Sequence, residues 1–322
     1  MVLGLQQDYQ VAATSKHYIA YSNNKGAREG MSRVDPQMPP HEVENIHVYP
    51  WREVIARGGL LGVMSAYNDY DGYPIQSSGY WLGERLRKDF GFRGYVVSDS
   101  DAVEYLHTKH RVSPDMKESV YQSVMAGLNV RCTFRSPDSY VLPLRELVRE
   151  GRIPMRVIDE RVRDILRVKF LVGLFDNPYQ TDYEAADREV DGPENYAVAL
   201  RASRESLVLL KNAGNTLPLD ASRLKQLAVI GPNADETAFV HTHYGPLATE
   251  AVSVYEGLSK ALGNKARVVY EKGCELVDAD WPLSEILPTE PTEEELAMIR
   301  RAVEAVRTSD AAVMVGAGGF CA

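Results

Sequence analysis

The chain has 322 residues, enough for two domains, and its mix of 44% hydrophobic and 25% charged residues is typical of a globular protein. A net charge of −9 without a basic block excludes nucleic acid and anionic membrane surfaces as expected partners. No apolar run approaches the ~20 residues of a membrane span, and the three widely spaced cysteines fit neither a disulfide framework nor a zinc site.

The first half of the chain alternates short apolar runs with helical patterns. A basic pair, Lys16-His17, follows a weakly apolar stretch, and a long polar loop is expected at 22–45. Beyond it, helices are expected at 46–58 and 78–89 and buried strands at 60–68 and 95–97. This order predicts an α/β domain with parallel strands.

The strand at 95–97 ends abruptly in Ser98-Asp99. A carboxylate at the C-terminal tip of a buried parallel strand lies where barrel enzymes place catalytic groups. The same residue could also cap the next helix or hold a loop together. The stretch alone leaves both interpretations open.

The alternation continues after Asp99. We expect Ser113 to cap a helix that Pro114 opens and Gly127 ends. The elements expected next are a short strand at 128–130 and helices at 142–148 and 154–172. We therefore assign 1–176 to the first domain.

A second α/β domain is expected at 194–322, after a linker at 177–193. Its predicted helices are 194–210, 254–262 and 293–307, and its predicted strands are 227–230, 266–270 and 311–315. A complete (β/α)₈ barrel rarely has fewer than ~200 residues. The first domain is therefore either another α/β fold or a barrel that begins before Met1.

No motif in the sequence predicts a cofactor or a metal ion. The glycines at 316–319 lack the third glycine of a dinucleotide loop, and 231–235 has no phosphate-binding lysine. The histidines show no metal-ligand spacing, and the pair Asp99 and Asp101 is weak evidence for a cation. We expect neither cofactor nor metal.

Five motifs nevertheless occur in an order that is informative about the family. They are Lys16-His17, 63–68, 91–99, 207–212 and 217–219. Together they closely resemble glycoside hydrolase family 3, which includes β-glucosidases and β-xylosidases. The resemblance runs from about Lys16 to Leu262 and continues more weakly to Val315. It implies part of a (β/α)₈ TIM-type barrel, followed by part of an α/β sandwich domain.

The resemblance also implies an activity, the retaining hydrolysis of terminal β-glycosides. Asp99 matches the family's nucleophile, and Lys16 and His17 match a pair that hydrogen-bonds sugar hydroxyls. Tyr67 matches a residue beside the nucleophile. Met64 matches a wall of the sugar pocket, although strand core is an equally simple interpretation.

Two parts of the family pattern have no counterpart in the sequence. Barrel strands that carry an Asp and an Arg of the sugar pocket would precede Met1, and the general acid/base would follow Ala322. We therefore expect a fragment with little activity alone and, because core surface would be exposed, with poor solubility. The cellular location and the oligomeric state stay open.

The preferred substrate is a β-linked oligosaccharide or an aryl or alkyl β-glucoside, with a β-xyloside as the alternative. A second hypothesis is a non-catalytic carbohydrate-binding protein that keeps the Lys16-His17 pair. A third is another α/β enzyme that binds a nucleotide in its second domain. The missing phosphate loop argues against this third hypothesis.

Overall fold

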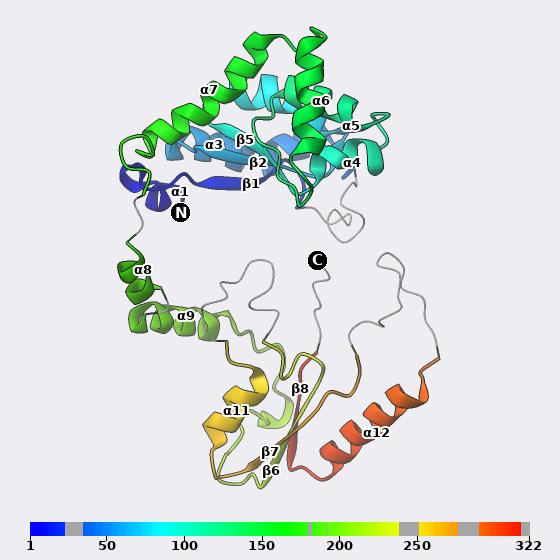
Figure 1. Ribbon diagram of the computed structural model, residues 1–322. Helices are drawn as coiled ribbons and strands as arrows, with labels where there is room; N and C mark the ends of the chain where they lie inside the picture. Colours follow the sequence, from blue (N-terminus) through cyan, green and yellow to red (C-terminus); the bar gives the residue numbers. More distant parts are fainter. Residues whose placement is uncertain (23–34, 180–181, 191, 238–250, 276–289, 317–322) are drawn as a thin grey trace. The chain divides into compact units, whose positions relative to one another are not determined.

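The computed structural model describes residues 1–22, 35–179, 182–190, 192–237, 251–275 and 290–316. The chain divides into two units, Met1–Gln180 and Thr181–Ala322 (Figure 1). Each unit contains a three-stranded parallel sheet with helices packed against it, as the predicted α/β class requires.

The sheet of the first unit has the order β1-β2-β5, with β1 at Thr14–Tyr18, β2 at Gly62–Ser65 and β5 at Tyr95–Ser98. Val63 of β2 pairs with Val96 of β5, and both side chains are fully buried. All three strands run parallel, so their carboxyl ends lie at one edge of the sheet.

Two local features determine where β5 begins and how little backbone pairing it has on the side away from β2. A Cβ atom on Gly94 would lie 2.0 Å from the carbonyl oxygen of Leu61, so glycine is needed at this approach to β2. On the other side, the strand expected at 128–130 is reduced to one bridge between Val97 and Val130. There the Asn129 side chain accepts the hydrogen bond of the Val96 N–H at 2.7 Å, which interrupts the regular backbone pairing.

Helices surround this sheet, and in Figure 1 α6 and α7 lie above it. The described helices of the unit are α1 (Val2–Leu5), η1 (Gln7–Tyr9), α2 (Pro40–Glu42), η2 (Val43–Val48), α3 (Tyr49–Gly58), η3 (Ile75–Ser77), η4 (Tyr80–Asp89), α4 (Ala102–Thr108), α5 (Met116–Ala126), α6 (Asp138–Arg149) and α7 (Met155–Leu171).

The expected cap at Ser113 is wrong. Helix α5 begins after Asp115, whose carboxylate accepts a hydrogen bond from the N–H of Glu118 at 2.8 Å. The Ser113 hydroxyl is buried and lies 2.7 Å from that of Ser119. Asp is at least as good a cap as Ser, and here it stands at the position from which its side chain can reach the third helical N–H.

The core of the first unit is centred on Tyr18 of β1, which is fully buried. Its ring meets Trp51 of α3 edge-on with 5.0 Å between centroids, and its hydroxyl donates to the carbonyl oxygen of Trp81 at 3.1 Å. Burying an aromatic side chain of this size contributes about 2 kcal/mol. The paired hydroxyl avoids the cost of an unsatisfied polar group.

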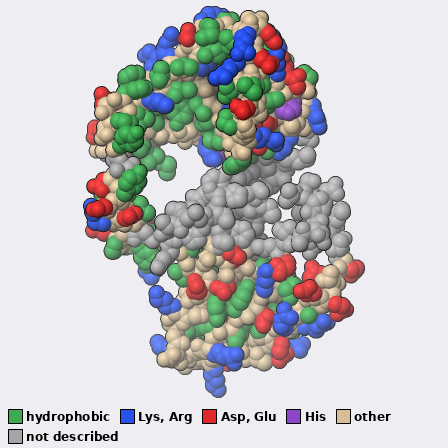
Figure 2. Space-filling view, in the orientation of Figure 1, with side chains coloured by type: hydrophobic (Ala, Val, Ile, Leu, Met, Phe, Trp, Pro, Cys, Tyr) green, Lys and Arg blue, Asp and Glu red, His purple; other side chains and the backbone are tan. Residues whose placement is uncertain are grey.

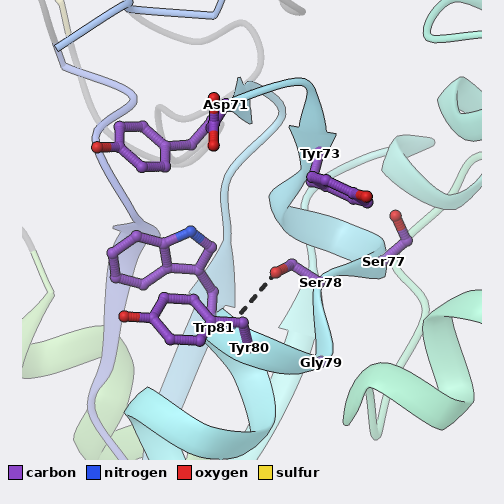
Figure 3. A pocket seen from close by; sticks show the side chains of 8 residues that line it. Asp71, Tyr73, Ser77, Ser78, Gly79, Tyr80 and Trp81 are labelled. Carbon is purple, nitrogen blue, oxygen red and sulfur yellow. Dashed lines mark hydrogen bonds between the residues drawn. The ribbon is translucent and has the colours of Figure 1, made fainter. Parts of the chain in front are cut away.

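A short hairpin follows β2, formed by β3 (Asp69–Tyr70) and β4 (Tyr73–Pro74). Asp71 and Gly72 have φ angles of 54° and 77°, as a two-residue turn between tightly paired strands requires. A cavity of about 390 Å³ lies between this hairpin and the start of η4 (Figure 3). Four aromatic residues, Tyr70, Tyr73, Tyr80 and Trp81, are among the eight that line it.

The second unit has the sheet order β7-β6-β8, with β6 at Gln226–Ile230, β7 at Arg267–Glu271 and β8 at Ala311–Met314. The side chains of β6 alternate between two clusters. Leu227 and Val229 pack with residues of α11 (Val254–Leu262), and Ala228 and Ile230 pack with residues of α12 (Glu293–Arg307). The two helices therefore cover opposite faces of the sheet, as Figure 1 shows.

The chain between the two sheets differs from expectation at two places. The expected linker 177–193 includes α8 (Tyr183–Glu189), which Asp182 caps by accepting from the N–H of Ala185 at 3.0 Å. The helix expected at 194–210 is α9 (Pro193–Ser206), and it ends early because Leu207 has an extended backbone with ψ 124°. A short 3₁₀ turn, η5 (Ala213–Asn215), follows.

Apolar side chains are exposed on both units. Leu207 to Leu210 are 63–92% exposed, and Phe170 and Phe175 near the end of α7 are more than half exposed. Figure 2 shows hydrophobic side chains on the viewed face of each unit. Surfaces of this kind favour association with other surfaces.

Candidate active site

The predicted site residues come from the three neighbouring strands of the first sheet. Lys16 and His17 belong to β1, Met64 belongs to β2, Tyr67 follows β2 by two residues, and Asp99 follows β5 directly. Tyr18 pairs with Ser65, and Ser65 pairs with Ser98, so these strand ends lie side by side. The parallel topology therefore brings residues far apart in sequence to one edge of the sheet.

The centre of the site is a contact between His17 and Asp99. His17 Nε2 lies 3.0 Å from Asp99 Oδ2, and the two side chains are 14% and 10% exposed. The other carboxylate oxygen, Oδ1, accepts a hydrogen bond from the N–H of Ser100 at 2.8 Å. Both oxygens of the buried carboxylate thus have a donor, which fixes its orientation.

These contacts decide the charge of Asp99. Burial by itself would raise the pKa of the Asp99 carboxyl, but hydrogen bonds from His17 and the Ser100 N–H oppose it. With the positive charge of Lys16 added, the balance holds the pKa below its usual value. Asp99 is therefore a carboxylate at neutral pH, although it is buried.

Tyr67 contacts the loop that carries Asp99. The Tyr67 hydroxyl donates to the carbonyl oxygen of Ser100 at 2.8 Å. His110 Nε2 lies 2.9 Å from the backbone carbonyl oxygen of Tyr67. Burial, and then the nearby charge of Asp99, raise the pKa of the Tyr67 phenol well above its usual value. The phenol therefore keeps its proton and stays a hydrogen-bond donor.

The two remaining predicted residues are Lys16 and Met64. Lys16 is an exposed residue of β1 whose charge reaches Asp99. Met64 is half-buried in β2 and pairs with Val97, two residues before Asp99. The structure thus brings His17, Tyr67 and Asp99 together and leaves Met64 in the neighbouring strand.

The sequence did not identify two aromatic residues of this site. The Tyr21 ring lies 4.7 Å from that of His17 and 5.7 Å from that of Tyr67. On α4, the Tyr105 ring lies 5.4 Å from that of Tyr67. The only available signal was four-residue spacing between His17 and Tyr21, which is too common to single out a site.

The cavity of Figure 3 is a different feature. It is lined by residues of the hairpin and of η4, and none of the five predicted site residues contributes to its wall. Within the described ranges, no group of three or more His, Cys, Asp or Glu side chains could hold a metal ion. Nor does any described helix have the length and apolarity to cross a membrane.

Comparison with known proteins links this geometry to a family. Residues 1–168 match the model of the glycosyl hydrolase family 3 N-terminal domain, and residues 207–318 match that of its C-terminal domain. A β-xylosidase of Formosa agariphila is 30% identical over 95% of this chain and 41% of its own length. A periplasmic β-glucosidase of Salmonella typhimurium is 31% identical over 95% of this chain and 40% of its own length.

Solved structures give the same result. A β-glucosidase from Erythrobacter marinus has a TM-score of 0.78 at 30% identity and covers 97% of this chain, which covers 42% of that protein. A β-glucosidase from Listeria innocua in complex with glucose has a TM-score of 0.73 at 26% identity, with coverage of 98% and 40%. The chain thus spans about two fifths of the length of these relatives.

Proposed function

Because the chain belongs to glycoside hydrolase family 3, we propose that it serves in the hydrolysis of terminal, non-reducing β-D-glycosides with retention of configuration. The observation that carries the proposal is the Asp99 carboxylate. It is buried at the end of a parallel strand, it is held by His17 and by the Ser100 N–H, and it is ionised at neutral pH. A fixed, ionised carboxylate is what a glycosidase nucleophile must be.

The reaction then proceeds in two displacements. An Asp99 oxygen attacks the anomeric carbon while the bond to the leaving-group oxygen breaks, and a general acid donates a proton to that oxygen. Water then attacks the same carbon, gives up a proton to the acid's conjugate base, and releases Asp99. The acid must lie about 5–5.5 Å from the nucleophile, and we assign this role to none of the described residues.

The neighbours of Asp99 take supporting roles in this proposal. We assign His17 and Lys16 to hydrogen bonds with sugar hydroxyls, since both belong to β1 and both act on the Asp99 carboxylate. Tyr67 holds the Ser100 carbonyl oxygen and thereby the loop that carries the nucleophile. Met64 is placed in the wall of the sugar pocket, where its thioether would contact the ring.

We further propose that the first unit is part of a (β/α)₈-type barrel and the second part of an α/β sandwich. The parallel β1-β2-β5 order, with the bridge to Val130, supports the first assignment. The β7-β6-β8 sheet with helices on both faces supports the second. The corresponding domains are 1–176 and 194–322, joined by 177–193.

For the sugar we propose a β-glucoside, with a β-xyloside as the alternative. The two differ by one hydroxymethyl group, and relatives with either name match the chain at similar identity. A pocket distinguishes one such group by about 1–3 kcal/mol.

Two assays test the proposal. The first measures p-nitrophenol release from the aryl β-glucoside and the aryl β-xyloside by the protein, with Asp99→Asn and the matched control Asp71→Asn in the hairpin turn. We expect this chain to release nitrophenol slowly, and we expect Asp99→Asn to abolish that release and Asp71→Asn to leave it intact. The second traps a 2-deoxy-2-fluoro glycosyl group, which mass spectrometry should locate on the peptide that carries Asp99. A label elsewhere, or release that Asp99→Asn leaves unchanged, would refute the assignment.

The alternative of a carbohydrate-binding protein without turnover predicts a different result. Calorimetry would then detect the sugar, while neither aryl glycoside releases nitrophenol. The buried pair of His17 and Asp99 favours hydrolysis over this alternative, because binding alone does not require a buried ionised carboxylate.

A further inference from the structure

The loop that carries Asp99 is held from outside by residues 130–133. The N–H of Ser98 donates to the carbonyl oxygen of Val130 at 2.9 Å, and the N–H of Cys132 donates to Ser98 Oγ at 2.9 Å. On the far side of Asp99, the N–H of Asp101 donates to the carbonyl oxygen of Cys132 at 3.0 Å. These bonds bracket the nucleophile, one residue before it and two residues after it.

Asp101 is the unusual residue of this loop. Its φ angle is 57°, in the left-handed region that residues other than glycine seldom occupy. It directly precedes α4, yet its side chain does not cap that helix. Its Oδ1 accepts a hydrogen bond from Thr133 Oγ1 at 2.5 Å, and its Oδ2 lies 3.7 Å from Arg135 Nε.

The hydroxyl of Thr133 has its full set of partners. Arg131 Nη2 donates to it at 3.2 Å and the N–H of Arg135 donates at 3.1 Å, so both acceptor positions are filled. Its single proton can go to Asp101 Oδ1 at 2.5 Å or to Glu104 Oε1 at 3.3 Å. The shorter contact indicates that the proton goes to Asp101.

The far end of this arrangement is a buried ion pair. Arg131 Nε donates to Glu104 Oε1 at 3.0 Å, and the two side chains are only 4% and 5% exposed. Glu104 lies on α4, the helix that follows the loop. Thr133 therefore joins a buried ion pair to Asp101, the left-handed residue two positions after the nucleophile.

We propose that Thr133 is a positioning residue, which holds Asp101 and thereby the direction in which Asp99 faces the sugar. This role rests on the proposed function of Asp99. Without the hydroxyl, the turn at Asp101 loosens, and the Asp101 side chain with its negative charge is free to shift toward Asp99. Both changes favour the protonated form of Asp99 and misalign it for attack.

The test compares Thr133→Val, which keeps the shape and removes the hydroxyl, with Thr133→Ser, which keeps the hydroxyl. We expect kcat/KM for the aryl β-glycoside to fall by about ten- to a hundredfold in Thr133→Val, mainly through kcat. Thr133→Ser should stay within about threefold of the parent protein. Equal losses in both variants, or none in either, would overturn the proposal.

A second pair of variants removes the acceptor in place of the donor. Asp101→Gly keeps the left-handed turn and loses the acceptor, whereas Asp101→Asn keeps an oxygen that Thr133 can reach. We expect a loss of about tenfold in Asp101→Gly and little loss in Asp101→Asn. The opposite order would overturn the proposal, even if Thr133→Val failed to fold.

A measurement independent of turnover separates this proposal from the proposed function. Carboxyl ¹³C NMR follows the titration of Asp99. His17 and Lys16 of β1 and Tyr67 after β2 act on this carboxylate, and Asp101 lies two residues further along the same loop. Thr133→Val should move that titration to higher pH, and Thr133→Ser should not. An unchanged titration would refute the role of Thr133, whereas a trapped glycosyl group on a residue other than Asp99 would refute only the proposed function.

Discussion

The two parallel sheets of this chain use an aspartate after a strand in opposite ways. Asp99 follows β5 directly, is buried, and accepts hydrogen bonds from His17 of another strand and from the Ser100 N–H. Asp235 follows β6 by five residues, is exposed, and accepts a hydrogen bond from the hydroxyl of Ser253 at 2.7 Å. Ser253 in turn caps α11.

The difference lies in what surrounds each carboxylate. Around Asp99, three strands contribute polar and aromatic groups that point to one place, which is the arrangement of a reaction site. At the corresponding edge of the second sheet, a cavity of about 750 Å³ is lined mostly by glycines and apolar side chains, together with Lys272, Glu275 and Arg307. The role of an aspartate that follows a strand therefore cannot be assigned until the groups around its carboxylate are known.

The largest expected effect separates the two aspartates by activity. Asp99→Ala should lower kcat/KM by at least about a thousandfold, because it removes the proposed nucleophile. Asp235→Ala should leave the rate unchanged and cost about 1 kcal/mol of stability, since it removes one partly buried hydrogen bond. Aryl glycoside kinetics and thermal unfolding of both variants check this. A loss of rate in Asp235→Ala would contradict the claim that only Asp99 of the two aspartates acts in catalysis.

The next effect concerns the pH dependence that His17 gives to Asp99. His17 lowers the pKa of Asp99, so the carboxylate stabilises the fold above its unfolded pKa of about 3.9. That stabilisation is lost as the pH falls through the lower, folded pKa. In His17→Ala the Asp99 pKa should rise, so the acid limb of kcat/KM and the acid loss of stability should both move to higher pH.

His17→Gln is the matched control for this shift, because its amide can still donate to Asp99 without carrying charge. Its acid limb should lie between those of the parent protein and His17→Ala. We expect kcat/KM at neutral pH to fall by about ten- to a hundredfold in His17→Ala. Identical pH profiles in all three proteins would show that His17 does not tune Asp99.

A smaller effect is expected for Tyr67→Phe, which removes only the hydroxyl that donates to the Ser100 carbonyl oxygen. One such hydrogen bond is worth about 1 kcal/mol, so stability should fall by that amount and the rate by about tenfold or less. Unfolding in urea and steady-state kinetics measure the two losses. A loss in rate as large as that of Asp99→Ala would assign Tyr67 a direct part in the chemistry.

The smallest effect falls in the second unit. Ser253 and Glu256 form a reciprocal cap at the start of α11, with the N–H of Glu256 donating to Ser253 Oγ at 3.0 Å. Ser253→Ala should cost about 1 kcal/mol of stability and leave the catalytic rate unchanged. Ser253→Thr keeps the hydroxyl and should recover most of the loss, which thermal unfolding would show.

Much of this organisation could be predicted from the sequence. The apolar run at 95–97 and the turn residues beside it located β5 and the aspartate at its end, because strand period and turn chemistry are local properties. The helix expected at 154–172 is α7, Met155–Leu171, since its apolar face repeats with the helical period. The sequence motifs at 16–17 and 91–99 indicated glycoside hydrolase family 3, to which the comparisons then assigned the chain.

Other features depended on contacts that the sequence does not reveal. The cap of α5 moved from Ser113 to Asp115 because the Ser113 hydroxyl finds Ser119 in the fold. The strand at 128–130 gave way to one bridge because an Asn129 side chain competes with the backbone. Likewise, the partners of Asp99 from β1 and the loop after β2 come together only through strand pairing.

Position 100 has a consequence for how this site can change in evolution. Asp99 Oδ1 is held by the backbone N–H of Ser100, and Tyr67 contacts the backbone carbonyl oxygen of the same residue. The Ser100 side chain itself lies 3.7 Å from Cys132 Sγ, outside both interactions. Any residue except proline can supply the same two backbone groups, so selection can vary the side chain beside the nucleophile without disturbing its support. The side chain at position 100 can therefore differ among related proteins while the Asp99 carboxylate beside it keeps its position.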